Sequence, residues 1–174
     1  MRMKIGLLIA ILLLAAMGLA GCYESNVPMA SSRQSTIDQN LLGAWKATIE
    51  SDGKQDKTLL EAVFYKFNDH EYYVRYKEEE KGEVTFTDLR VYTVVVNGVP
   101  FFNVHDIESA DDSKRSYNFF RYSLSGDGVL TLKMVIDRLF ETKFDTSEKL
   151  YEFIQKNLEN EKLYGDPIRF VKIK

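Results

Sequence analysis

Several segments after Leu41 alternate between apolar and polar residues with a period of two, and this pattern restricts the fold more than any other feature. Over Tyr72–Lys77, tyrosine, valine and tyrosine fall on one face, and tyrosine, arginine and lysine fall on the other. Such alternation is typical of antiparallel strands with one face on a core. We predict strands at Ala44–Glu50, Thr58–Phe67, Glu71–Lys77, Glu83–Val96, Phe101–Ile107, Ser116–Leu124 and Val129–Ile136.

Short turn sequences separate these strands. Asn68-Asp69, Asn97-Gly98 and Ser125–Gly128 contain the residues that hairpin turns favour. With a further strand at Ile168–Ile173, we expect an all-β fold with one helix. Its strands form an antiparallel up-and-down meander of about eight, closed into a barrel or folded into a sandwich.

One amphipathic helix is expected before the last strand. Asp145–Glu148 offers an N-cap followed by an acidic residue three positions on. Leu150, Phe153, Ile154 and Leu158 then recur at helical spacing, with charged residues on the opposite face. Because that polar face mixes glutamate with lysine, we expect the apolar stripe to pack on the barrel wall or across a barrel mouth rather than on a membrane.

The N-terminal segment has the layout of a signal peptide. Arg2 and Lys4 precede a long uncharged apolar run that ends at Leu19–Cys22, which holds the only cysteine of the chain. This ending resembles the lipobox of bacterial lipoproteins, and the resemblance implies cleavage before Cys22 and acylation of that residue. The alternative is a transmembrane helix, since the run reaches about 18 residues, but no basic cluster follows Cys22.

These features divide the chain into a signal peptide (1–21), a lipidated cysteine with a flexible tether (22–40) and a barrel domain (41–174). The tether is expected to be flexible because it is rich in serine and has few large apolar residues. Removing the signal peptide leaves 153 residues and takes the formal net charge from −3 to −5, since Arg2 and Lys4 are lost. A mildly acidic domain argues against nucleic acid as a partner.

The expected location is the cell envelope. The resemblance to lipoproteins implies membrane attachment through the acyl chains of Cys22, which suffice for stable anchoring. Tyr23 is not an aspartate, so in a Gram-negative organism the resemblance implies transfer to the outer membrane. With Cys22 acylated, no thiol remains for a disulfide or for cysteine catalysis.

A short motif at the start of the first predicted strand suggests a fold family. Gly43 and Trp45 resemble the Gly-x-Trp signature of the lipocalins and related calycins. In that family the tryptophan closes one end of an eight-stranded up-and-down barrel, and an arginine from a late strand packs over it. The resemblance implies that role for Trp45 and assigns Arg169 as the arginine. The helix departs from the family pattern, because it precedes the last strand.

The sequence contains no clear motif for catalysis or for cofactor binding. His70 falls in a predicted turn, and His105 precedes Asp106 in a strand, where neighbours point to opposite faces. No spaced ligand set for zinc or calcium is present, and no phosphate-binding glycine loop follows a strand. We therefore expect no metal, no cofactor and no enzymatic activity. A paired-carboxylate hydrolase stays open as a third alternative without positive support.

Aromatic residues are the remaining functional candidates. They alternate with polar residues on the middle strands, and if they point inward they line the barrel lumen: Tyr72, Tyr76, Phe102, Phe120 and Tyr122. Eight-stranded barrels either hold one small ligand or are filled by side chains. Two function classes follow. The first is a lipoprotein that binds a small hydrophobic ligand, and the alternative is a non-catalytic module with a filled core that contacts another envelope protein.

Overall fold

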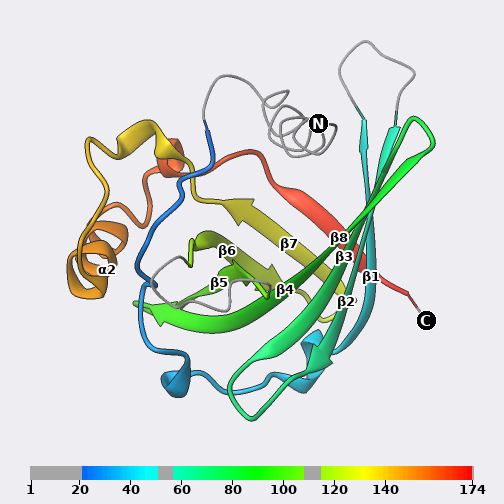
Figure 1. Cartoon of the computed structure of the whole chain (residues 1–174), viewed down its shortest axis with the longest axis horizontal. Helices are drawn as coiled ribbons and strands as arrows, with labels where there is room; N and C mark the ends of the chain where they lie inside the picture. The colour runs from blue at the N-terminus through cyan, green and yellow to red at the C-terminus, as the bar shows by residue number, and fades with distance from the viewer. Residues whose placement is uncertain (1–20, 51–56, 108–114, 174) are drawn as a thin grey trace, which may run out of the picture.

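The computed structural model describes residues 21–50, 57–107 and 115–173, in which the chain forms a closed antiparallel barrel (Figure 1). Its strands are β1 (Gly43–Glu50), β2 (Lys57–Lys66), β3 (Tyr72–Glu80), β4 (Glu83–Val96), β5 (Val99–Asp106), β6 (Asn118–Leu124), β7 (Val129–Met134) and β8 (Ile168–Lys172). Each strand pairs with its neighbours in sequence, and β8 closes on β1. The predicted meander is confirmed, and it is a barrel rather than a sandwich. Residues 1–20 of the predicted signal peptide lie outside the described residues.

The two ends of the barrel differ. At the closed end lie the β2–β3, β4–β5 and β6–β7 turns, together with a 3-10 turn, Gln39–Leu41, that immediately precedes β1. At the other end, here called the mouth, β1, β3, β5 and β7 finish. The β3–β4 hairpin reaches further than predicted, because Lys81 and Gly82 form a tight turn with φ of 52° and 81°. Positive φ at both central residues matches the twist of the flanking strands, so pairing continues to Glu80↔Glu83.

The inward side chains form the barrel core, which is concentrated at the closed end. It is built from large apolar residues of every strand and of the 3-10 turn that precedes β1. Its buried members are Leu41, Trp45, Ala47, Leu60, Ala62, Phe64, Tyr72, Val74, Val91, Phe102, Tyr122, Leu130 and Phe170. The fold therefore has the tightly packed interior that a domain without disulfides needs.

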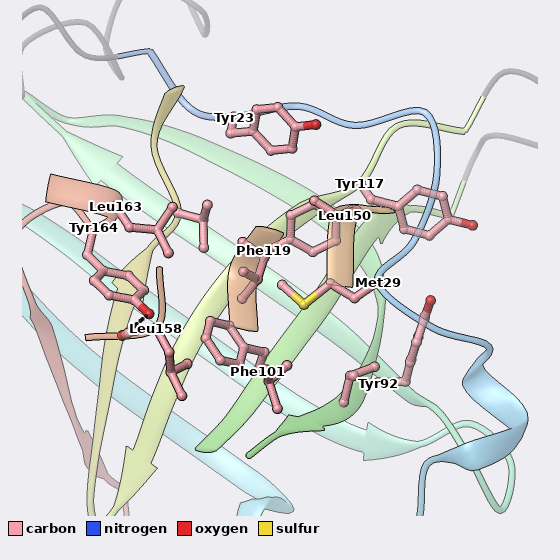
Figure 2. Packing of buried hydrophobic residues seen from close by; sticks show 14 residues of the cluster. Tyr23, Met29, Tyr92, Phe101, Tyr117, Phe119, Leu150, Leu158, Leu163 and Tyr164 are labelled. Carbon is pink, nitrogen blue, oxygen red and sulfur yellow. Dashed lines mark hydrogen bonds between the residues drawn. The ribbon is translucent and has the colours of Figure 1, made fainter. Parts of the chain in front are cut away.

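A second apolar cluster lies outside the barrel, against the outward faces of β4, β5 and β6. Figure 2 shows its members converging from the N-terminal segment, the barrel wall and the β7–β8 connection. The helix α2 (Ser147–Lys156) contributes Leu150 and Ile154, both fully buried. Its N-cap is Thr146, within the predicted capping segment Asp145–Glu148 but one residue after Asp145, and the Thr146 side chain accepts a hydrogen bond from Lys149 N. Of the two predicted placements for the helix, the structure has the barrel wall rather than the mouth.

The segment predicted as a flexible tether instead packs along this wall, and we call residues 22–41 the strap. Tyr23 and Met29 are buried in the outer cluster. The backbone of Ser25 pairs with that of Tyr117, and Met29 N donates to Asn103 Oδ1 at 2.9 Å. The composition is polar, as the sequence indicates, but its few apolar residues cover strand faces that would otherwise be exposed to water. The prediction of a free tether was therefore wrong for these residues.

The strap runs from the mouth rim to the closed end, where it continues into β1. Near its end, Ser35 Oγ accepts a hydrogen bond from Thr93 N at 3.1 Å, on a part of β4 that β3 does not reach. Asp38 N donates to the hydroxyl of Tyr72 at 2.7 Å. The strap thus satisfies polar groups at the end of the sheet as well as burying apolar surface.

Candidate ligand site

The closed half of the lumen is filled by three of the five aromatic candidates. Tyr72, Phe102 and Tyr122 are buried, and the rings of Phe102 and Tyr122 stack with centroids 3.9 Å apart. Burial raises the pKa of Tyr72 to about 12, and it also raises the pKa of Tyr122. These three residues therefore belong to the barrel core. The hydroxyl of Tyr72 bonds to the strap, and the hydroxyl of Tyr122 bonds to Thr93.

Seven inward apolar side chains nearer the mouth are only half-buried. We call them the mouth ring, which has one residue from every strand except β2: Ile49, Tyr76, Leu89, Val104, Phe120, Leu132 and Ile168. They pack against the barrel core, but unlike its members they are not fully buried. The other two aromatic candidates, Tyr76 and Phe120, belong to this ring. Apolar and aromatic side chains of this kind are the usual lining of sites for small hydrophobic ligands.

Polar groups lie at the β3 side of the mouth ring. Glu78 follows Tyr76 on the inward face of β3 and pairs in register with Leu60 and Thr85. Burial, reinforced by nearby Glu80, raises the pKa of the Glu78 carboxyl. The pKa of Tyr76 is also raised, first by burial and then by the charge of Glu78. The ring therefore combines an apolar lining with one side that offers a phenol and a carboxyl group.

Trp45 lies in the barrel core near the closed end. Its indole is completely buried, and Nε1 donates a hydrogen bond to the carbonyl of Leu41 at 2.8 Å. Gly43 starts β1 with φ of 110°, which a residue with a side chain rarely adopts. Both residues of the short motif therefore contribute to the junction between the 3-10 turn and β1.

The cation over Trp45 is not the predicted one. Arg169 is exposed on the outward face of β8, in register with Thr131, so the expected packing of Arg169 on the indole is wrong. Lys172 takes this position, with Nζ 5.0 Å from the centroid of the indole ring. The same Nζ donates to the carbonyl of Asn40 at 2.7 Å. Side chains alternate along β8, so Phe170 and Lys172 share the inward face that Arg169 cannot reach.

The candidate lipidation site lies at the mouth rim. Cys22 forms an isolated antiparallel bridge with Ile136, just beyond the end of β7. The neighbouring Tyr23 is buried, with its ring stacked on Phe140 at 3.5 Å between centroids. A surface pocket of about 320 Å³ adjoins this point, lined by Cys22, Tyr23, Glu24, Asp137, Phe140, Glu141, Thr142 and Lys143.

The two histidines lie outside the lumen. His105 is buried on the outward face of β5, against the edge of Tyr117 at 5.3 Å between ring centroids. Its Nδ1 contacts the backbone carbonyl of Asp106 at 3.0 Å, not the carboxylate. Nδ1 of His70 lies 2.8 Å from the carbonyl of Ser35 in the strap. In the part of the chain that the structure describes, no three potential metal ligands come together.

Sequence reasoning missed Lys172 and five of the mouth-ring residues. Alternation along β8 could have favoured Lys172 over Arg169, because Phe170 is the large apolar residue that marks the inward face. The ring members Ile49, Leu89, Val104, Leu132 and Ile168 are ordinary core-type residues in the sequence. Only the barrel geometry separates them from the fully buried positions.

Comparisons with known proteins found no match: the chain matches no protein-family model, no curated protein and no solved structure. Within residues 21–50, 57–107 and 115–173, no helix is long and apolar enough to cross a membrane.

Proposed function

We propose that the protein is a non-catalytic lipoprotein of the cell envelope, anchored through acylated Cys22, whose lipocalin-like barrel binds a small hydrophobic ligand. One observation carries the ligand proposal: the mouth ring is lined by half-buried apolar side chains, whereas the closed half is packed. In a barrel filled solely by its own side chains, these inward positions would be buried like Tyr72 and Phe102. The ligand's apolar part lies against the ring, and a polar group meets Tyr76 and Glu78.

Thermal unfolding of the mature polypeptide with a panel of fatty acids, lysolipids and long-chain amines tests the ligand proposal. A ligand that binds only the folded state at 100 times its Kd stabilises the protein by about 2.7 kcal/mol. For a domain of this size, the melting temperature then rises by about 5–11 °C. Mass spectrometry of molecules that co-purify with the native protein identifies the natural ligand independently.

The anchoring proposal has its own test. The support for it is the lipobox-like sequence Leu19–Cys22 behind an apolar run with basic residues at its start. We expect Cys22→Ser to yield an uncleaved or soluble product without acyl chains. Wild-type processing and membrane attachment of Cys22→Ser would contradict the proposal, and mass spectrometry of the wild-type N-terminus would show which residue carries the lipid.

A protein-interaction module is the alternative. Leu59, Val84 and Phe86 are 43%, 46% and 60% exposed on the outward faces of β2 and β4, which favours a contact surface there. An unchanged melting temperature with the whole ligand panel, together with a partner protein crosslinked at Phe86, would support the interaction module.

A further inference from the structure

No flexible segment separates the proposed anchor, Cys22, from the part of the strap that is packed on the barrel. Tyr23 is 3% exposed, its backbone N–H donates to the carbonyl of Val135 at 3.2 Å, and its ring stacks on Phe140. Cys22 itself bridges to Ile136. A flexible tether of the length first predicted would span roughly 20–25 Å. Here the residue that carries the acyl chains is instead the direct neighbour of a residue packed into the outer cluster.

The direction of the strands places Cys22 at the mouth. β7 runs from the closed end, at Val129, toward the mouth, and Val135 and Ile136 follow its last residue. In Figure 1 the dark-blue start of the described chain and the green tip of the β3–β4 hairpin both lie at the top of the view. The β2–β3 turn of the closed end lies at the bottom. The anchor and the opening of the barrel therefore share one end of the molecule.

We infer that the acyl chains of Cys22 seat the mouth end of the barrel on the lipid bilayer, so that the mouth ring faces the membrane surface. This inference rests on the proposed acylation of Cys22. Consecutive Cα atoms are about 3.8 Å apart, and the polar layer of each leaflet is roughly 5–8 Å thick. With Cys22 at headgroup depth, the docked Tyr23 and the mouth rim next to it lie within that layer. The closed end, with Trp45, points away.

This orientation gives an apolar ligand a short path. A lipid-like molecule would pass from the bilayer to the mouth ring without crossing bulk water, and so avoid the cost of exposing its apolar surface. The β3–β4 hairpin at the same end carries Glu79, Glu80 and Glu83 beside Lys81. Its net negative charge is repelled by anionic lipid, so contact is closest on zwitterionic phosphatidylcholine.

Two matched cysteine variants test the orientation. Val84 lies near the mouth on β4 and Val171 lies near the closed end on β8. Both are outward-facing valines, 46% and 49% exposed. Because acylation occupies Cys22, Val84→Cys and Val171→Cys each offer a single thiol for a fluorophore. We expect doxyl-phosphatidylcholine in phosphatidylcholine vesicles to quench the label at residue 84 at least twofold more strongly than the label at residue 171.

A flexible Gly/Ser spacer of about 15 residues between Cys22 and Tyr23, which would span roughly 20–25 Å, is the control. It leaves the anchor and the docked strap in place but separates them, so we expect quenching at the two positions to become equal. Equal quenching without the spacer, in protein shown by mass spectrometry to be acylated, would overturn the orientation and leave the anchoring intact. An unacylated Cys22 would instead remove the proposed anchoring, and the inference with it.

Discussion

Replacing Lys172 by methionine tests how the closed end of the barrel is held. Lys172 Nζ lies 5.0 Å from the indole centroid of Trp45 and donates to the carbonyl of Asn40 at 2.7 Å. A cation–π contact of a partly exposed lysine contributes about 0.5–1 kcal/mol, and a hydrogen bond contributes about 0.5–1.5 kcal/mol net. Methionine keeps the aliphatic stem and loses both interactions. We therefore expect Lys172→Met to lower the free energy of unfolding by about 1–2.5 kcal/mol.

The assay is thermal unfolding followed by circular dichroism and by fluorescence. Trp45 is the only tryptophan of the chain, so its emission reports directly on the site. At about 2–4 °C per kcal/mol for a domain of this size, Lys172→Met should lower the melting temperature by about 2–10 °C. Trp45→Ala is the reference for a large loss of stability at this site, since truncation of a buried tryptophan costs about 3–5 kcal/mol.

The matched control is Arg169→Met, three residues earlier on the same strand. Arg169 is exposed on the outward face, and surface substitutions of this kind usually change stability by less than about 0.5 kcal/mol. If Arg169→Met destabilised the protein and Lys172→Met did not, the assignment of Lys172 as the cation over Trp45 would be wrong. Unchanged Trp45 emission in Lys172→Met would contradict it as well.

Three further outcomes are expected from other sites. Tyr23→Ala should destabilise the protein by about 3–5 kcal/mol as an aromatic core truncation and speed proteolysis within the strap, whereas Tyr65→Ala, at a side chain 52% exposed, should have little effect on either. Burial lowers the pKa of His105 below its ordinary value near 6.5, so the folded state favours the neutral ring. Stability should therefore fall as the pH drops from about 7.5 through 6.5 toward that lowered pKa, and His105→Asn should flatten this slope in urea unfolding at a series of pH values. Tyr72→Phe removes the acceptor of Asp38 N–H and should cost about 1–2 kcal/mol, measured by the same unfolding assay.

Most of the strands could be predicted from the sequence. Glu83–Val96 was predicted with the observed ends, because the segment is rich in β-branched and aromatic residues and ends at the turn residues Asn97 and Gly98. The helix was predicted from its N-cap and apolar stripe, since both signals are local. The sequence left a barrel and a sandwich as alternatives, because closure depends on pairing between β8 and β1, which are far apart in the chain.

The strap could not be predicted from composition. Its serine-rich sequence has the average character of a free linker, and average hydrophobicity is the quantity from which we predicted disorder. Tyr23 and Met29 become buried because the outward faces of β4 to β6 are themselves apolar and need a cover. In β5, the adjacent residues Phe101 and Phe102 point to opposite faces and both are buried. The sequence alone does not show that both faces of such a strand are covered, so it could not predict that the strap packs there.

The candidate site was predicted in part. The aromatic residues do point inward, but Tyr72, Phe102 and Tyr122 fill the closed half, whereas Tyr76 and Phe120 reach the mouth ring. Depth along the barrel axis separates these two groups, and depth depends on strand tilt and register, which alternation alone does not encode.

A titration of two matched variants with a fluorescent fatty acid tests ligand binding in the mouth half most directly. Val104→Trp places an indole inside the mouth ring, whereas Val84→Trp places one on the outward face near the same end. With both variants folded by circular dichroism, we expect Val104→Trp to weaken binding at least tenfold, because it fills the space that the ligand would take. Val84→Trp should bind like wild type. Saturable binding that Val104→Trp leaves unchanged, or no binding to the wild-type protein by any member of the panel, would contradict a ligand site in the barrel.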